Sequence, residues 1–401
     1  MKKLFFLITI LLFAFQLNAK NLVDLYKSGG IVIQPDDDFA INTDWETVFG
    51  KRAGEAKYPQ KFFTDIAVAG DGSVFAVNGK LYTISKFDEN GNFLLKFGGK
   101  GKGQGKFQWP CGSIDILDEK YVIVSEYDCP KIHLFDLNGN FVKTIKTNYS
   151  VKDFVALTNN KIGIHGFKRN EKIKRGKDFV LILNVSTGDE KKLGEYTIYY
   201  AVPDSGQIGI TGFGRTKRFF ICKTKTGKLI AGFSGIPDIK VYDADGQELN
   251  SIHLNYKQLS NEFDEKLFRR DAAHIEKIMR KNIPDISEEK IKKNIEEFMS
   301  GRRKDFELNP LKPFFYDLWT DSDDNLLVLK VTEGNRFVHK FQVYSLEGEF
   351  VCESQLHLTK GWIHPKKELL TFHDGYLYGL VQKSEGTSGK MRLIRMKLLE
   401  R

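Results

Sequence analysis

Histidine and acidic side chains are the candidates in this sequence for binding a metal or catalysing a reaction. The aspartate-rich runs at 36–38 and 321–324 lack the alternating acidic spacing and terminal glutamate of a calcium loop. No close His-x-x-x-His pair occurs among the histidines, which are His133, His165, His253, His274, His339, His357, His364 and His373. Local motifs therefore predict no metal site and no cofactor, although ligands from separate strands could still meet.

A second set of residues could bind a ligand without reacting with it. Tryptophan beside arginine or lysine suits a sugar ring, an aromatic group or an anionic peptide. The alternative is that the tryptophans pack beneath their own loops, because tryptophan is highly buried on average. The candidate ligand-binding residues are Trp109, Arg215, Lys217, Arg218, Trp362 and His364.

Short strands must position these side chains, because one β-pattern is written twice between residues 62 and 145. Each copy has four strands of alternating apolar residues and two tight turns, which is the pattern of one blade of a β-propeller. A large apolar residue before each outer turn is expected to pack between neighbouring blades. These residues are Phe87, Phe135, Leu183, Tyr242 and Tyr344.

Turn dipeptides extend the repeat over the rest of the chain. Asn-Gly and Asp-Gly supply the positive φ angles that tight hairpins need. Six inner turns are recognisable, against five outer ones, so the last unit is one strand short. We predict that an N-terminal segment, containing Ile31 to Ile33 and residues 39–49, adds that strand and closes a six-bladed ring.

Two regions interrupt the repeat. Residues 168–177 are rich in lysine and arginine and are expected to form a solvated loop in blade three. Residues 257–304 carry apolar residues at helical spacing, broken at Pro284, which predicts a two-helix insertion between blades four and five. The insertion should project over the face of the inter-blade connections, either as a fixed cap or as a lid or docking platform.

Four aspartates lie near the starts of expected inner strands and could face the central channel: Asp65, Asp115, Asp153 and Asp317. Together with His133 and His165 they could hold a divalent metal if they converged on the axis. The interpretation that we favour is that they hydrogen-bond backbone groups at blade junctions.

The N-terminus has the pattern of a secretory signal peptide over residues 1–19, followed by one propeller domain over residues 20–401. Without Lys2 and Lys3 the chain has 59 basic and 52 acidic residues, a net charge of +7 that favours anionic partners. No second long apolar segment follows, so we expect a periplasmic or secreted protein with no transmembrane segment. In an exported chain, Cys111 and Cys129 are a candidate disulfide, expected at the same end of one blade.

The stretch from Lys100 to Pro110 and the Phe-Asp-Leu-Asn-Gly-Asn-Phe turn at 135–141 resemble NHL-repeat proteins. More closely, the chain is similar to secreted bacterial six-bladed propellers of the NHL and TolB-like group. The resemblance implies an all-β fold and a binding or scaffolding role, although some relatives are lyases or metal-dependent lactonases.

We therefore expect a non-catalytic module that binds a protein, peptide or glycan in the cell envelope, with no specific nucleic-acid partner. The alternatives are a metal-dependent hydrolase or lyase with its site in the channel, and a polyanion-binding module whose affinity falls with salt.

Overall fold

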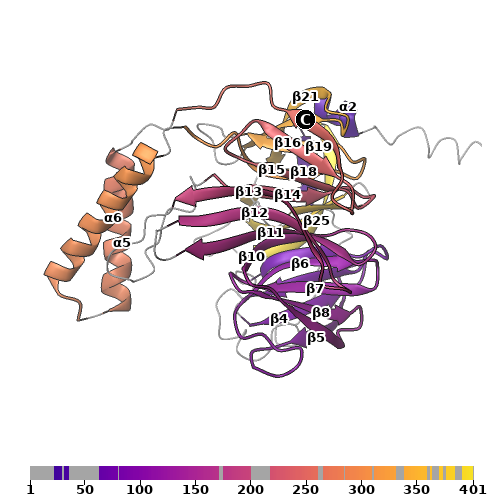
Figure 1. Cartoon of the computed structure of the whole chain (residues 1–401), viewed down its shortest axis with the longest axis horizontal. Coiled ribbons are helices and arrows are strands. Elements are labelled where there is room, and N and C mark those ends of the chain that lie inside the picture. The colour runs from indigo at the N-terminus through magenta and orange to yellow at the C-terminus, as the bar shows by residue number, and fades with distance from the viewer. Residues whose placement is uncertain are drawn as a thin grey trace, which may run out of the picture.

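Four consecutive parts of the chain each fold into a four-stranded antiparallel sheet in the computed structural model. The structure describes residues 22–28, 31–35, 63–79, 81–170, 175–199, 217–260, 265–283, 285–308, 311–330, 338–358, 362–363, 370–373, 376–383 and 391–400. The predicted signal peptide and residues 39–49 lie outside these ranges. The arrangement is a six-bladed β-propeller, as predicted (Figure 1).

The first four blades follow the chain in order, each with its inner strand first. Blade one contains β2 (Phe63–Val68), β3 (Val74–Asn78), β4 (Thr83–Phe87) and β5 (Phe93–Gly98). Blade two contains β6 (Cys111–Leu117), β7 (Tyr121–Glu126), β8 (Lys131–Asp136) and β9 (Phe141–Lys146). Blade three contains β10 (Ser150–Ala156), β11 (Lys161–Asn170), β12 (Arg175–Asn184) and β13 (Glu190–Tyr199). Blade four contains β14 (Phe219–Lys223), β15 (Leu229–Phe233), β16 (Asp238–Tyr242) and β17 (Glu248–His253).

The last two blades share one nine-stranded sheet. Blade five contains β18 (Phe315–Thr320), β19 (Leu326–Lys330), β20 (Val338–Tyr344) and β21 (Phe350–Leu358). Blade six contains β22 (Trp362–Ile363), β23 (Leu370–His373), β24 (Tyr376–Lys383), β25 (Met391–Glu400) and the N-terminal β1 (Ile31–Pro35). The predicted closure by an N-terminal strand is confirmed, because β1 pairs antiparallel with β25.

Strand β1 also does something that the repeat pattern does not predict. It pairs in parallel with β21, so a single strand joins blades five and six through backbone hydrogen bonds. The short helix α2 (Leu22–Lys27) packs beside β21 with its buried Leu22, Leu25 and Tyr26. The Tyr26 hydroxyl donates to Asp321 Oδ2 at 2.8 Å, which ties the helix to the first turn of blade five.

Neighbouring blades pack through apolar clusters. Separate clusters join blades one and two, two and three, three and four, and four and five, while α2 extends the cluster between blades five and six. The five residues predicted to pack before the outer turns are all buried: Phe87, Phe135, Leu183, Tyr242 and Tyr344. The turn prediction also holds, since both Asp118 and Glu119 have positive φ angles, of 50° and 51°.

The expected solvated loop at residues 168–177 is corrected by the structure. Lys168 pairs with Lys177 and Asn170 pairs with Arg175, so β11 and β12 continue as a hairpin to residues 170 and 175. Strand pairing satisfies the backbone of residues 168–170 and 175–177, which composition alone had assigned to a loop, and residues 171–174 lie outside the described ranges.

The two-helix insertion is confirmed with different bounds. Helix α5 spans Glu265–Asn282 and helix α6 spans Glu288–Leu308, so the second helix continues past the predicted end at residue 304. An antiparallel bridge between Ser260 and Leu311 closes the base of the insertion. Figure 1 shows the pair standing apart from the ring, on the side toward which the long strands of blade three extend. Among the described residues, no helix is long and apolar enough to cross a membrane.

Candidate functional site

The six predicted ligand-binding residues fall into three groups in the structure. Arg215 and His364 lie outside the described residues, and Trp362 is placed in β22 without a described side chain. Lys217 and Arg218 lead into blade four, where the Arg218 guanidinium lies over the Phe220 ring, 4.6 Å from its centroid. Trp109 belongs to the connection between blades one and two. Among the described contacts, none joins Trp109 to Lys217 or Arg218.

Trp109 is an exposed aromatic residue on a fixed backbone. Its side chain is 60% exposed, which contradicts the alternative that it packs beneath its own loop. Its N–H donates to Glu126 Oε2 at 2.6 Å, and the N–H of Gln108 donates to the same oxygen at 3.0 Å. Phe107, two residues earlier, is fully buried against His133 and Phe135. The loop is thus anchored by one buried ring and one buried carboxylate.

Tyr127 lies beside this loop and was not predicted as a site residue. It is 61% exposed, and its N–H donates to the carbonyl oxygen of Pro110 at 2.7 Å. It follows β7 directly, in the turn whose next residue, Asp128, has a φ angle of 51°. The sequence feature that could have predicted the exposure of Tyr127 is its position in a turn, one residue after the end of a strand. We call the exposed pair Trp109 and Tyr127 the aromatic platform.

Glu126 accepts the backbone N–H of Trp109 and directly precedes Tyr127 in the chain. It is fully buried at the end of β7, and its Oε1 lies 2.9 Å from His133 Nε2 and 3.8 Å from Lys131 Nζ. Because a carboxylate only accepts, His133 Nε2 carries the hydrogen in this pair. Burial alone raises the pKa of Glu126, but the hydrogen bonds from His133 and the Trp109 N–H outweigh it and hold the pKa below its usual value.

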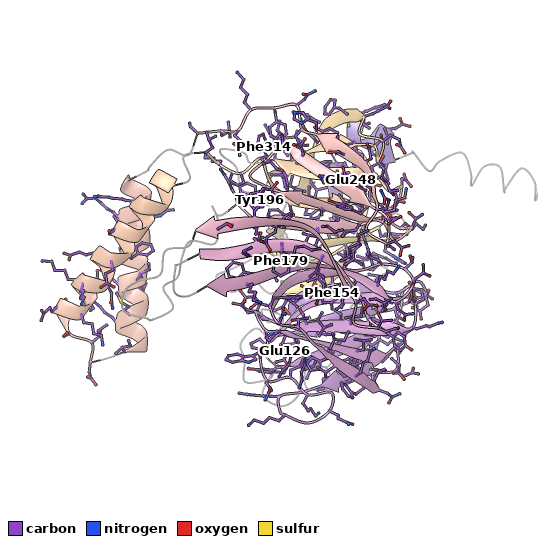
Figure 2. The ribbon with its side chains drawn as sticks, viewed as in Figure 1. Glu126, Phe154, Phe179, Tyr196, Glu248 and Phe314 are labelled. Atoms are coloured by element: carbon purple, nitrogen blue, oxygen red, sulfur yellow. The ribbon has the colours of Figure 1, made fainter. Side chains whose placement is uncertain are left out.

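The position of Glu126 gives the face to which the platform belongs. Figure 2 shows Glu126, Tyr196 and Phe314 toward the side of the propeller that faces α5 and α6, with Glu248 toward the other side. Strand β7 ends on this side, and the inter-blade connections lie there as well. The platform therefore lies on the same side of the ring as the helical insertion.

A basic, glycine-rich loop leads into the platform. Between Glu89 and Asp115 the sequence contains no acidic residue and four lysines, Lys96, Lys100, Lys102 and Lys106. Lys100 forms a parallel bridge with Phe107, and the Gly101 N–H donates to the Phe107 carbonyl oxygen at 3.0 Å. Gly98 has a φ angle of 90°, and a Cβ there would lie 2.8 Å from the Phe107 ring. The glycines thus let the loop fold closely over the ring that anchors it.

The channel aspartates act mainly as joints between blades. Asp65 Oδ2 accepts the N–H of Ile114 at 2.9 Å, which links blade one to blade two. Asp115 Oδ2 accepts the N–H of Ala156 at 2.7 Å, which links blade two to blade three. For Asp65 and Asp115 these bonds confirm the interpretation that we favoured from the sequence, whereas Asp153 accepts the N–H of its own neighbour, Phe154, at 2.8 Å. Asp317 accepts the N–H of its own neighbour, Leu318, at 3.0 Å.

The charges of Asp115 and Asp153 are close enough to affect the pKa of Asp65. Burial and the charges of Asp153 and Asp115 raise the pKa of Asp65 well above its usual value. Burial also raises the pKa of Asp153, although Ser113, His165 and Arg218 partly oppose it. Across the channel, Lys223 Nζ of blade four pairs with Asp115 Oδ1 at 2.7 Å.

The two histidines considered with the aspartates are engaged elsewhere. His165 Nε2 lies 2.7 Å from Asp178 Oδ1, and Asp178 Oδ2 accepts the N–H of Phe219 in blade four. His133 pairs with Glu126, as described above. Within the described part of the chain, no group of three or more histidine, cysteine, aspartate or glutamate residues is placed to hold a metal ion.

All four cysteines are free thiols in the structure, so the expected bridge between Cys111 and Cys129 is not formed in it. Cys111 and Cys129 both border Glu126: Cys111 is its strand partner, and the Cys129 N–H donates to its carbonyl oxygen at 3.2 Å. Burial, and next the charge of Glu126, raise the pKa of both thiols.

Comparison with known proteins gives likeness in fold only. No family model matches the chain, and none of the curated proteins matches it. A member of the DUF4221 family from Bacteroides vulgatus is 10% identical, with a TM-score of 0.53 and coverage of 93% of this chain and 100% of that one. A candidate exported protein of Bacteroides fragilis is 10% identical, with a TM-score of 0.52 and coverage of 92% of this chain and 95% of that one. The chain is therefore similar to these two propellers along almost its whole length.

Proposed function

We propose that this protein is a non-catalytic binding module whose aromatic platform recognises a protein, peptide or glycan. The carrying observation is that two aromatic side chains on hydrogen-bonded backbone segments are about 60% exposed, Trp109 bonded through its N–H to Glu126 and Tyr127 through its N–H to Pro110. A side chain on a backbone that is fixed before binding loses less conformational freedom on contact with a ligand than one on a mobile loop, so more of the interaction energy appears as affinity.

The cell envelope or the extracellular space is the proposed location. The N-terminal sequence has the three-part pattern of a signal peptide, and one structural neighbour is described as a candidate exported protein. Both observations support export without identifying the compartment.

Chemistry in the channel receives less support. Asp65 and Asp115 accept backbone N–H groups of the next blade, and Asp115 also pairs with Lys223. Carboxylates engaged in this way stabilise the ring, and recruiting them for a reaction would break blade junctions.

The test is binding of the full chain to immobilised polysaccharides, neutral and acidic, and to a peptide array. We expect the double variant Trp109→Ala, Tyr127→Ala to lose at least tenfold in affinity for whichever probe binds. Phe350→Ala is the matched control, because Phe350 is 53% exposed in an outer strand of blade five and lies far from the platform in sequence. Undiminished binding by the double variant, or no binding to any probe, would contradict the proposal.

A further inference from the structure

The residues around the platform indicate which class of ligand it binds. This inference rests on the proposed function. The loop that delivers Trp109 carries positive charge without compensation in its own sequence, because no acidic residue occurs between Glu89 and Asp115. Lys100, Lys102 and Lys106 are all exposed. By contrast, the exposed Lys177 pairs with Glu195, so its charge is balanced locally.

The fold brings the backbone of this basic loop close to the segment that carries Trp109, while Lys100 Nζ lies over the Tyr82 ring, 5.4 Å from its centroid. The parallel bridge between Lys100 and Phe107 turns the loop back on itself, so the backbone of Lys100 lies beside Phe107, two residues before Trp109. Phe107 N–H donates to Gly99 O at 2.9 Å, and Lys106 Nζ donates to Gly98 O at 2.5 Å, which closes the loop. Lys131 hydrogen-bonds Gln108 and adds a further cation at the base of Trp109.

Charge and ring type together favour one chemistry. Flat, exposed aromatic faces can stack on the apolar faces of sugar rings, and lysine ammonium groups attract carboxylates as point charges. We propose that the platform binds an acidic polysaccharide, with sugar rings on Trp109 and Tyr127 and uronate carboxylates beside Lys100 and Lys102.

Single-stranded nucleic acid also combines stacking with negative charge. The side chain best suited to bidentate phosphate recognition is arginine, and the sequence contains none between Arg52 and Arg169, which covers blades one and two. The acidic polysaccharide is therefore the favoured ligand, and nucleic acid is an outcome that the experiment can detect.

The experiment measures affinity of the full chain for polygalacturonate and alginate by calorimetry, with methyl-esterified polygalacturonate as the neutral match. We expect the acidic polymers to bind at least tenfold more tightly than the ester, and affinity to fall as salt rises. The double variant Lys100→Gln, Lys102→Gln should reduce that affinity at least fivefold. The double variant Trp109→Ala, Tyr127→Ala should reduce it at least tenfold. The control Lys290→Gln, Lys292→Gln removes two exposed lysines of α6 and should leave it unchanged.

Four results would overturn the inference: no binding to either acidic polymer, equal binding of the ester, an equal loss in the α6 control, or tighter binding of a single-stranded oligonucleotide. Different results would contradict the proposed function. It survives if a neutral glycan or a peptide binds in a manner that depends on Trp109 and Tyr127, and it falls if binding of every probe is independent of them.

Discussion

The carboxylate of Glu126 is buried beneath the two exposed rings that it helps to position. Its folded-state pKa is depressed, so it contributes stability above the unfolded pKa of about 4.3, and this contribution is lost as pH falls through the folded value. Acid should therefore release the Gln108–Trp109 backbone before the blade cores unfold, because the apolar clusters do not titrate.

Substitution of Glu126 tests that role. Glu126→Ala leaves two N–H groups and His133 without their acceptor and should destabilise the fold by about 3–5 kcal/mol. Glu126→Gln keeps an acceptor of the same shape and should cost about 1–3 kcal/mol, with a weaker dependence of stability on acid pH. Urea unfolding between pH 3 and pH 7 measures both effects. Equal stability of the two variants would show that Glu126 does not hold the loop.

The cysteines give a second prediction at this scale. Burial is the first cause that raises the pKa of all four thiols, so the native protein should react slowly with a thiol reagent. Four thiols should titrate once the chain is unfolded without reductant. A titre of two thiols would instead restore the predicted bridge between Cys111 and Cys129.

Helices α5 and α6 form an insertion that we expect to be dispensable for folding of the ring. Their main packing partner within the described residues is each other, and Arg280 joins them by pairing with Glu276 of α5 and Glu288 of α6. Besides the Ser260–Leu311 bridge, the Lys312 N–H donates to Leu259 O at 2.9 Å, so the insertion leaves and re-enters the ring at one place.

Replacing residues 261–310 with a short Gly-Ser turn should therefore remove the helical signal from the circular dichroism spectrum and preserve one cooperative unfolding transition. Polysaccharide binding by this variant distinguishes whether the insertion is a fixed cap, a separate docking platform or a lid. Unchanged affinity means a fixed cap or a separate docking platform, and altered affinity means a lid over the aromatic platform. Loss of the folded ring would show that the hairpin belongs to the propeller core.

At the scale of the whole molecule, closure depends on one N-terminal segment. Strand β1 lies between β21 and β25, Ile31 is buried, and Tyr26 packs edge-on against Phe341 with ring centroids 5.6 Å apart. The segment therefore closes the ring through a shared strand and also fills the core between blades five and six.

Tyr26→Ala should destabilise the whole ring by about 3–5 kcal/mol, because it opens a cavity in that core. Tyr26→Phe removes only the hydrogen bond to Asp321 and should cost about 0.5–1.5 kcal/mol. Asp24→Ala, at an exposed position of the same helix, should change stability by less than about 0.5 kcal/mol. Urea unfolding ranks the three variants, and a negligible effect of Tyr26→Ala would exclude the closing role of α2.

The sequence by itself determined the elements of this protein. Strand alternation and turn dipeptides are local properties of the chain, so they predicted the blades, the packing residues such as Phe135, the closing strand and the helical insertion. Composition was a poorer guide at residues 168–177, because whether a basic stretch forms a loop or a hairpin depends on a partner strand.

Only the tertiary structure decided which residues lie together. The sequence singled out Trp109 and grouped it with residues of other blades, while its neighbours Tyr127 and Glu126 come from the other end of the same blade's first hairpin. Spatial proximity here arises from hairpin register and from the bridge between Lys100 and Phe107. Likewise, the parallel pairing of β1 with β21 leaves no pattern in the sequence, because it follows from where the ring closes.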